Sequence, residues 1–256
     1  MIFSGNTRFE IKRAEANRMA FSLLELLVVI ALIMVLSGLL LHAIKQGKGA
    51  ADGSVCFSNL RQMGLAAQLY WDDHDGRTFR YRGASTNGGD HYWFGWIERG
   101  SEGTRRFDAS QGALARYGTA RGVETCPALN IKLREFKRKA TGVSYGYGYN
   151  LILSASAQHP ARNIQEFLNP SGLAVFADSA QINTFQPPAS PTNPMLEEFY
   201  YISQFEATTH FRHRDTASTL FLDGHVGREK MRSESLDLRL PLQRVGRLLD
   251  ARITGG

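Results

Sequence analysis

The sequence predicts an α+β protein in which a long N-terminal helix packs on a small globular head with an antiparallel sheet. Residues 21–41 are an uninterrupted apolar run, and residues 55–70 place apolar side chains three and four positions apart. Short strand patterns separated by turn residues follow after residue 140. The averages, 43% hydrophobic residues and a net charge of +6 over 256 residues, exclude a multi-span membrane protein. Two cysteines exclude a disulfide-dense miniprotein.

The apolar run reads FSLLELLVVIALIMVLSGLLL and contains one ionisable group, Glu25. A helix of this length covers about 30 Å, the thickness of the hydrocarbon core of a bilayer. Four basic residues precede the run, which predicts a cytoplasmic N-terminus and a head outside the cytoplasm. The alternatives are a helix buried in a soluble core, a cleaved secretory signal and a plain signal anchor. Neither of the last two explains a carboxylate inside the membrane, which usually marks function.

The segment from Ala20 to Ile30, AFSLLELLVVI, closely resembles the prepilin cleavage and methylation signal of type IV pilins and type II secretion pseudopilins. The family usually has glycine where this chain has Ala20. The resemblance implies cleavage between Ala20 and Phe21, and methylation of the new Phe21 amine by a prepilin peptidase. It also implies other pilin-type subunits and an assembly platform as partners. In a bundle of such helices, the amine of one chain can pair with the Glu25 carboxylate of its neighbour.

Two further stretches resemble one pseudopilin-like group. One is NLRQMGLA at residues 59–66 followed by Tyr70, and the other is a His-x9-Asp-Gly motif formed by His213, Asp223 and Gly224. The predicted organisation is a leader (1–20), a transmembrane helix (21–44), a membrane-proximal amphipathic helix (45–75) and an extracytoplasmic head (76–256). Glycines 47, 49 and 53 predict a bend or a melted turn between the two helical parts, since glycine weakens a helix.

Within the head, tyrosine alternates with glycine over residues 144–150, which predicts a strand with its rings on one face and close backbone contact on the other. Residues 173–177 predict a buried strand that ends at Asp178. Four prolines predict a loop over residues 186–194. Residues 219–226 predict a hairpin whose two-residue turn is Asp223-Gly224. The apolar spacing of residues 241–253 predicts a terminal helix that Pro241 starts.

The His-x9-Asp-Gly segment also carries the candidate metal ligands, since imidazole and carboxylate are typical zinc ligands. They are His210, His213, Asp223 and His225. The competing interpretation is that His213 and Asp223 hold the hairpin by hydrogen bonds. The sequence has no recognisable nucleophile elbow, phosphate loop or His-Glu-x-x-His helix, so we expect no enzymatic activity and no cofactor other than a divalent metal.

Two function classes stay open beside the pilin-type subunit. One is a membrane-tethered metal-binding or hydrolytic domain, and the other is a surface-binding or DNA-binding tip subunit. The aromatic stretch HYWFGW at residues 91–96 lies near several arginines, but such arginines are typical of a solvated face, so nucleic acid is not an expected partner. Cys56 and Cys126 would face an oxidising compartment, which permits one disulfide between the membrane-proximal helix and the loop at residues 125–127. The sequence leaves their distance open.

Overall fold

The computed structural model describes residues 22–118, 125–141, 146–154 and 161–256. The chain divides into two compact units, residues 1–46 and residues 47–256. The long helix α1 (Leu23–Asp73) begins in the first unit and continues into the second. The leader and Phe21, and with them the predicted processing site, lie outside the described residues.

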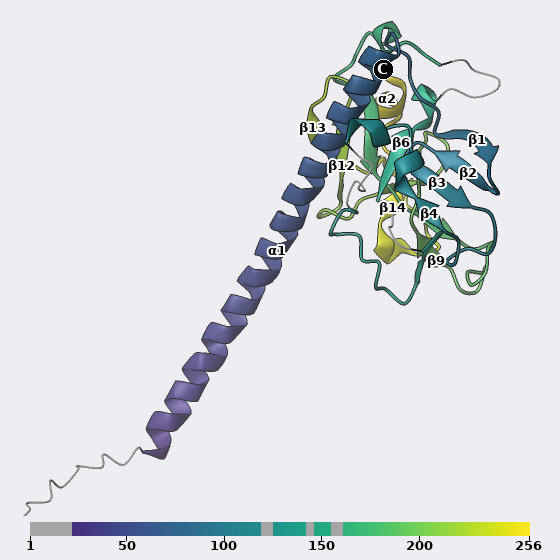
Figure 1. The fold of residues 1–256 in the computed structure, drawn as a ribbon. Coiled ribbons are helices and arrows are strands. Elements are labelled where there is room, and N and C mark those ends of the chain that lie inside the picture. Colours follow the sequence, from purple (N-terminus) through teal and green to yellow (C-terminus); the bar gives the residue numbers. More distant parts are fainter. Residues whose placement is uncertain (1–21, 119–124, 142–145, 155–160) are drawn as a thin grey trace, which may run out of the picture. The chain divides into compact units, whose positions relative to one another are not determined.

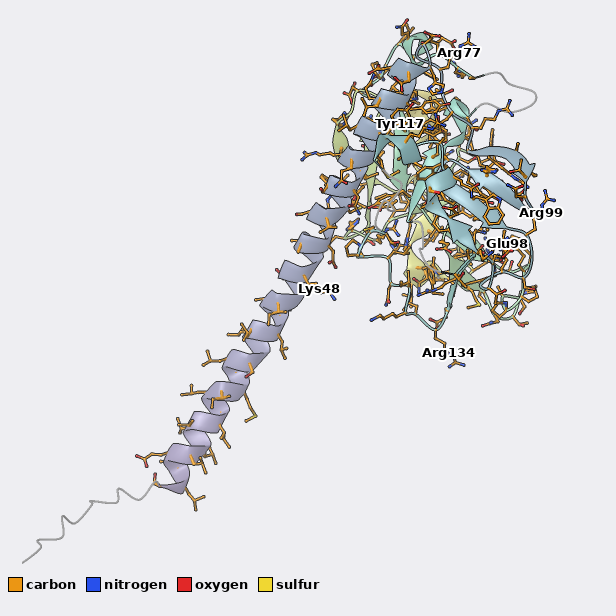
Figure 2. The ribbon with its side chains drawn as sticks, in the orientation of Figure 1. Lys48, Arg77, Glu98, Arg99, Tyr117 and Arg134 are labelled. Carbon is orange, nitrogen blue, oxygen red and sulfur yellow. The ribbon has the colours of Figure 1, made fainter. Side chains whose placement is uncertain are left out.

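In the first unit, the described part of α1 exposes apolar side chains on every face from Leu23 to Ile44 (Figure 2). Among the described residues, α1 is the one helix that is long and apolar enough to cross a membrane. Its first turn is closed by a capping box. The Glu25 backbone N–H donates to Ser22 Oγ at 3.1 Å, and Glu25 Oε2 accepts from the Ser22 backbone N–H at 2.9 Å.

In the second unit, one face of α1 is buried in the head. The buried side chains recur at helical spacing: Cys56, Leu60, Met63, Ala67 and Trp71. Leu65 and Leu69 on the other face are exposed. The prediction of an amphipathic second half is therefore confirmed, and α1 ends at Asp73, just before the turn at residues 74–76.

The predicted melted turn near residues 47–53 is wrong, because α1 is helical without interruption. Each glycine destabilises the helix by about 0.5–1 kcal/mol, which is small compared with the cooperative stabilisation from the helical turns on either side. Gly53 also has a packing role. A Cβ at this position would lie 2.3 Å from Arg228 Nη2, so the missing side chain makes room for the arginine.

The strands that the structure describes in the head form four sheets. Figure 1 shows how they are arranged. The first sheet contains β1 (Arg82–Thr86), β2 (Gly89–Tyr92), β3 (Gly95–Glu98) and β4 (Phe107–Asp108). The second has the order β10 (Tyr201–Ile202), β6 (Tyr147–Asn150), β7 (Ala174–Asp178), β12 (Thr216–Phe221) and β13 (Val226–Lys230). The third has the order β5 (Phe136–Lys137), β9 (Met195–Glu197) and β8 (Gln181–Asn183), and the fourth pairs β11 (Thr209–His210) with β14 (Val245–Gly246).

The head is α+β, as predicted, but its sheets are mixed. Strand β10 runs parallel to β6, and β5 runs parallel to β9, while the other pairs are antiparallel. The predicted antiparallel pairing is therefore confirmed for most of the described strands, and the two parallel pairs are an addition that the sequence pattern does not indicate. Antiparallel strands can follow one another through short hairpins, whereas these parallel pairs join segments that are far apart in the chain.

The five-stranded sheet packs against the second half of α1, with β12 and β13 beside the helix in Figure 1. Gly64 allows the close approach, since a Cβ there would lie 2.9 Å from Leu220 Cδ1 on β12. Strand β6 confirms the predicted two-faced pattern. Tyr147 and Tyr149 are buried in the core, and a Cβ at Gly148 would lie 2.7 Å from the carbonyl carbon of Tyr201. Residues 144 and 145 of that predicted strand lie outside the described residues.

The predicted buried strand and the predicted loop are confirmed, while the predicted hairpin has a longer loop than expected. The buried strand is β7, and residues 186–194 form a loop. The hairpin connects β12 and β13, but its strands stop at Phe221 and resume at Val226, so its loop is longer than two residues. Asp223 Oδ1 accepts from the backbone N–H of His225 at 3.1 Å, which shapes this longer loop.

The predicted terminal helix over residues 241–253 is wrong. A short 3-10 turn (Pro241–Gln243), strand β14 and a short helix α2 (Asp250–Thr254) occupy the segment. Arg244 has a φ of 53°, in the left-handed region that interrupts a helix. Residues of β14 pair with β11, so sheet hydrogen bonds replace the helical ones that the apolar spacing predicts.

Candidate metal centre

Asp178, the last residue of β7, lies fully buried among polar groups. Its Oδ1 accepts from Arg212 Nη2 at 2.9 Å and from Cys56 Sγ at 3.2 Å. Its Oδ2 accepts from the backbone N–H of Ser218 at 2.7 Å and lies 3.4 Å from His213 Nε2. Both carboxylate oxygens are thus engaged, as a buried charge requires.

A second cysteine lies beside these groups. Cys126 Sγ lies 3.2 Å from His213 Nε2. One ligand atom from each of Cys56, Cys126, Asp178 and His213 lies within 4.8 Å of every other, and all four residues are buried. We call these four residues the buried ligand cluster. Two sulfurs, one imidazole and one carboxylate can hold a transition metal ion.

Four separate parts of the chain supply the buried ligand cluster. Cys56 comes from α1, Cys126 from the loop before β5, Asp178 from β7, and His213 from the connection between β11 and β12. That connection is a tight turn in which the backbone N–H of His213 donates to the carbonyl of Thr216 at 3.0 Å. Two residues of this turn, at positions 214 and 215, have a positive φ, and His213 beside them is buried.

A buried ion pair sets the electrostatics of the cluster. The Arg212 side chain is 3% exposed, and it also donates to the carbonyl of Gly146. Burial disfavours the charged guanidinium, but the Asp178 carboxylate raises the pKa of Arg212 overall. The positive charge of Arg212 therefore persists inside the head and balances the negative charge of Asp178.

The two thiols have pKa values shifted in opposite directions. The hydrogen bond to Cys126 and then burial raise the pKa of Cys56. The same hydrogen bond, followed by the charge of Arg212, lowers the pKa of Cys126. Cys126 is thus the thiol that ionises more readily, and a thiolate is the form that binds metals.

The sequence-predicted candidate ligands do not form one site. His213 belongs to the buried ligand cluster, but the other three candidates do not. His210 is buried on β11 with its Nδ1 3.3 Å from Arg212 Nη1, and burial, followed by the Arg212 charge, lowers its pKa far below 6.5. Asp223 and His225 pair with each other in the hairpin loop, with His225 Nδ1 2.6 Å from Asp223 Oδ1. The predicted set of four ligands is wrong because strand β12 separates them. His210 and His213 precede this strand in the chain, and Asp223 and His225 follow it.

The hydrogen-bond interpretation of the motif is half right. Asp223 does hold the hairpin, through the backbone N–H and the ring of His225. His213 instead faces Cys126 and Asp178. Gly224, with a φ of 89°, supplies the left-handed turn residue.

Sequence reasoning missed Asp178 and Arg212 as site residues. The available signal was a carboxylate that directly ends a wholly apolar strand, since a buried charge needs a partner. The sequence did indicate a pairing of Cys56 with Cys126. The structure brings these two free thiols together within the buried ligand cluster, and the disulfide between them stays a prediction.

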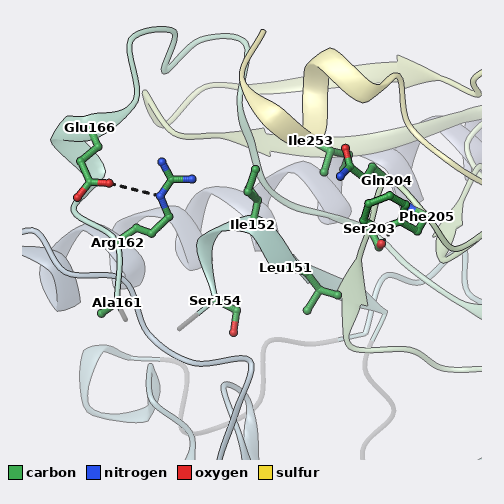
Figure 3. A pocket seen from close by; sticks show the side chains of 10 residues that line it. All are labelled: Leu151, Ile152, Ser154, Ala161, Arg162, Glu166, Ser203, Gln204, Phe205 and Ile253. Carbon is green, nitrogen blue, oxygen red and sulfur yellow. Dashed lines mark hydrogen bonds and ion pairs between the residues drawn. The ribbon is translucent and has the colours of Figure 1, made fainter. Parts of the chain in front are cut away.

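The head also has a hollow of about 590 Å³, shown in Figure 3. Its described lining includes one carboxylate, Glu166, whose Oε2 lies 3.4 Å from Arg162 Nε. The Ser154 hydroxyl accepts from the backbone N–H of Tyr81 at 2.9 Å. The described lining contains no histidine, cysteine or second carboxylate, so its polar groups do not assemble a metal site.

The aromatic stretch of residues 91–96 is part of the first sheet. Trp93 and Trp96 are buried, with their ring N–H groups donating to backbone carbonyls of Tyr200 and Thr86. These two rings therefore do not offer a stacking surface for single-stranded nucleic acid.

No protein-family model matches the chain, and neither a curated protein nor a solved structure shows significant similarity to it.

Proposed function

We propose that the protein is a pseudopilin or minor pilin-type structural subunit of a type II secretion or type IV pilus-like envelope complex. A prepilin peptidase cleaves it after Ala20 and methylates Phe21. The helix at residues 21–44 anchors it in the cytoplasmic membrane, with the N-terminus in the cytoplasm and the head outside. Other pilin-type subunits then pack against this helix.

One observation carries the proposal. The apolar half of α1 is exposed on every face, while the other half of the same helix is part of the head's core. Exposed apolar surface of this extent is unfavourable in water, at about 25 cal/mol per Å². A bilayer covers it while the subunit is stored, and neighbouring helices cover it after assembly.

The proposed role is structural and not enzymatic. In the described head, Cys56, Cys126, Asp178 and His213 form the buried ligand cluster. Each is less than 5% exposed, which leaves a substrate no direct approach. A buried set of this kind suits a structural centre.

Mass spectrometry of the N-terminus of the protein from membranes tests the proposal. A chain that starts with N-methylated Phe21 is the expected result, and the same chain from cells without prepilin peptidase should start at Met1. A chain from the normal cells that starts at Met1, or that is cut after residue 37, contradicts the proposal.

A further inference from the structure

We propose that Cys56, Cys126, Asp178 and His213 bind one zinc ion, and that this ion fastens the membrane-proximal part of α1 to the head. The proposal is independent of the prepilin route, because it rests on residues 56–213 alone. His213 is the one ligand that it shares with the candidates of the His-x9-Asp-Gly segment, and Cys56, Cys126 and Asp178 lie outside that segment.

The ligand types and their spacing fit tetrahedral zinc. Zinc binds two thiolates, an imidazole nitrogen and a carboxylate oxygen at about 2.0–2.3 Å, so ligand atoms of one ion lie about 3.3–3.8 Å apart. The Cys126 sulfur lies 3.2 Å from His213 Nε2, and His213 Nε2 lies 3.4 Å from Asp178 Oδ2. The Cys56 sulfur lies 3.2 Å from Asp178 Oδ1. Small shifts of side chains bring four such atoms around one ion.

Charge balance favours a divalent ion at this position. Zinc carries two positive charges and Arg212 carries one, while two thiolates and Asp178 carry three negative charges. The buried group is therefore neutral with the ion bound. It is also neutral without it, when both thiols keep their protons and Arg212 pairs with Asp178. Zinc binding thus requires both cysteines as thiolates and leaves no unpaired buried charge.

Groups around the four ligands orient them. Arg212 and the backbone N–H of Ser218 hold the two oxygens of Asp178. The Tyr147 hydroxyl donates to Cys56 Sγ at 3.4 Å and accepts from Asn59 Nδ2 at 3.2 Å. Such outer contacts fix ligand direction in metal sites, and their loss typically weakens metal affinity about 10- to 100-fold.

All four coordination positions come from protein, and all are buried, which is the pattern of a structural zinc site. The ligands join α1, the loop before β5, the end of β7 and the turn before β12. One ion therefore crosslinks segments that are distant in the chain, and it closes long loops of the unfolded chain. The ion couples the position of the membrane-proximal part of α1 to the folded state of the head.

The full chain, purified in detergent with a phosphine reductant and without oxygen, provides the test. We expect one zinc per chain by elemental analysis. Removal of the zinc by a chelator should lower the unfolding temperature, and added zinc should restore it. Cobalt(II) added to the zinc-free chain should give the intense visible bands of a tetrahedral ion and a thiolate-to-cobalt charge-transfer band.

Two histidine variants provide the matched comparison. His213→Ala should lose the zinc and the cobalt spectrum. His210→Ala removes an equally buried histidine three residues away, outside the buried ligand cluster, and should keep both. Tyr147→Phe should keep the bound ion but weaken its affinity about 10- to 100-fold.

Three results would overturn the proposal. The first is wild-type chain that contains no zinc and gives no cobalt bands. The second is a Cys56–Cys126 disulfide in protein alkylated directly in membranes, since bridged sulfurs cannot act as thiolate ligands. The third is loss of metal in His210→Ala to the same extent as in His213→Ala. The wild-type spectra decide the question even where a variant fails to fold.

Discussion

At the scale of single residues, a second group of buried charges stabilises the head away from the buried ligand cluster. Glu197 on β9 is fully buried, and its Oε1 lies 2.6 Å from Lys137 Nζ and 3.0 Å from Lys139 Nζ. Glu102 also contacts Lys137. Burial works against the Glu197 charge, but the two lysines and hydrogen bonds lower its pKa overall. The carboxylate is therefore the shared partner of two buried lysines.

Replacing this carboxylate should be costly in a pH-dependent way. We expect Glu197→Gln to lower the free energy of unfolding by about 3–5 kcal/mol near pH 7, because both buried lysines lose the Glu197 carboxylate and are left with Glu102 as their ion-pair partner. A carboxyl group with a lowered folded pKa stabilises the fold above its ordinary pKa of 4.5, and this contribution is lost as the pH falls below that value. The difference in the free energy of unfolding between the variant and the wild type should therefore shrink below pH 4.5.

Urea unfolding followed by tryptophan fluorescence measures this difference, since all three tryptophans lie in the second unit, residues 47–256, and are buried there. Arg99→Gln is the control, because Arg99 is exposed and lies 3.2 Å from Asp90. An exposed pair of this kind contributes about 0–1 kcal/mol. If Glu197→Gln lowers the free energy of unfolding equally at pH 7 and at pH 4, the proposed role of the Glu197 charge is contradicted.

At the scale of elements, α1 has two halves with different environments. Predicting the helix required only local patterns, and both the apolar run and the amphipathic spacing are confirmed. The segment at residues 241–253 carries similar spacing yet folds as a turn, a strand and a short helix. Val245, Leu248 and Ile253 of that spacing are buried, but Leu242 is exposed, because pairing with the distant strand β11 determines the backbone conformation.

Packing of α1 on the head should depend on one face of the helix. Leu60 is fully buried, and Leu65, about one and a half turns away, is 63% exposed. We expect Leu60→Ala to lower the free energy of unfolding of the head by about 2–5 kcal/mol, because it leaves a cavity against the five-stranded sheet. Leu65→Ala should change it by less than about 0.5 kcal/mol. Tryptophan fluorescence during urea unfolding measures both, and equal effects would refute one-sided packing.

At the scale of the whole molecule, the chain combines a head that has its own core with an apolar helix whose described side chains are exposed. The core lies entirely within residues 47–256, and its main cluster includes Leu60, Met63, Phe176 and Leu220. The described residues before Gln46 are exposed. This division is what the proposed subunit requires, because the head buries its own apolar residues while the helix is left to mediate assembly.

Glu25 allows a sharp test of assembly, since it has two roles to separate. Locally, it forms the capping box with Ser22, which glutamine can also form. Between subunits, the proposed partner is the Phe21 amine of a neighbour, which requires a negative charge. We expect Glu25→Gln to keep membrane insertion and the head fold but to impair assembly as strongly as Glu25→Ala. Crosslinking in membranes measures assembly.

The matched control is Ser22→Ala, which removes the capping hydroxyl and keeps the Glu25 charge. It should assemble nearly as the wild type does. Normal assembly by Glu25→Gln together with failure of Glu25→Ala would instead assign the residue a purely local capping role.

Local sequence patterns were enough to predict the apolar helix, its amphipathic continuation, the strand that ends at Asp178 and a hairpin around Gly224. Each of these depends on residues that are neighbours in the chain, whose spacing and turn preferences act locally. Only the tertiary structure decided that Cys56, Cys126, Asp178 and His213 converge, and that the sheets are mixed. Those features depend on which distant segments pack together, because the burial of a charge or a thiol is settled by its neighbours in space.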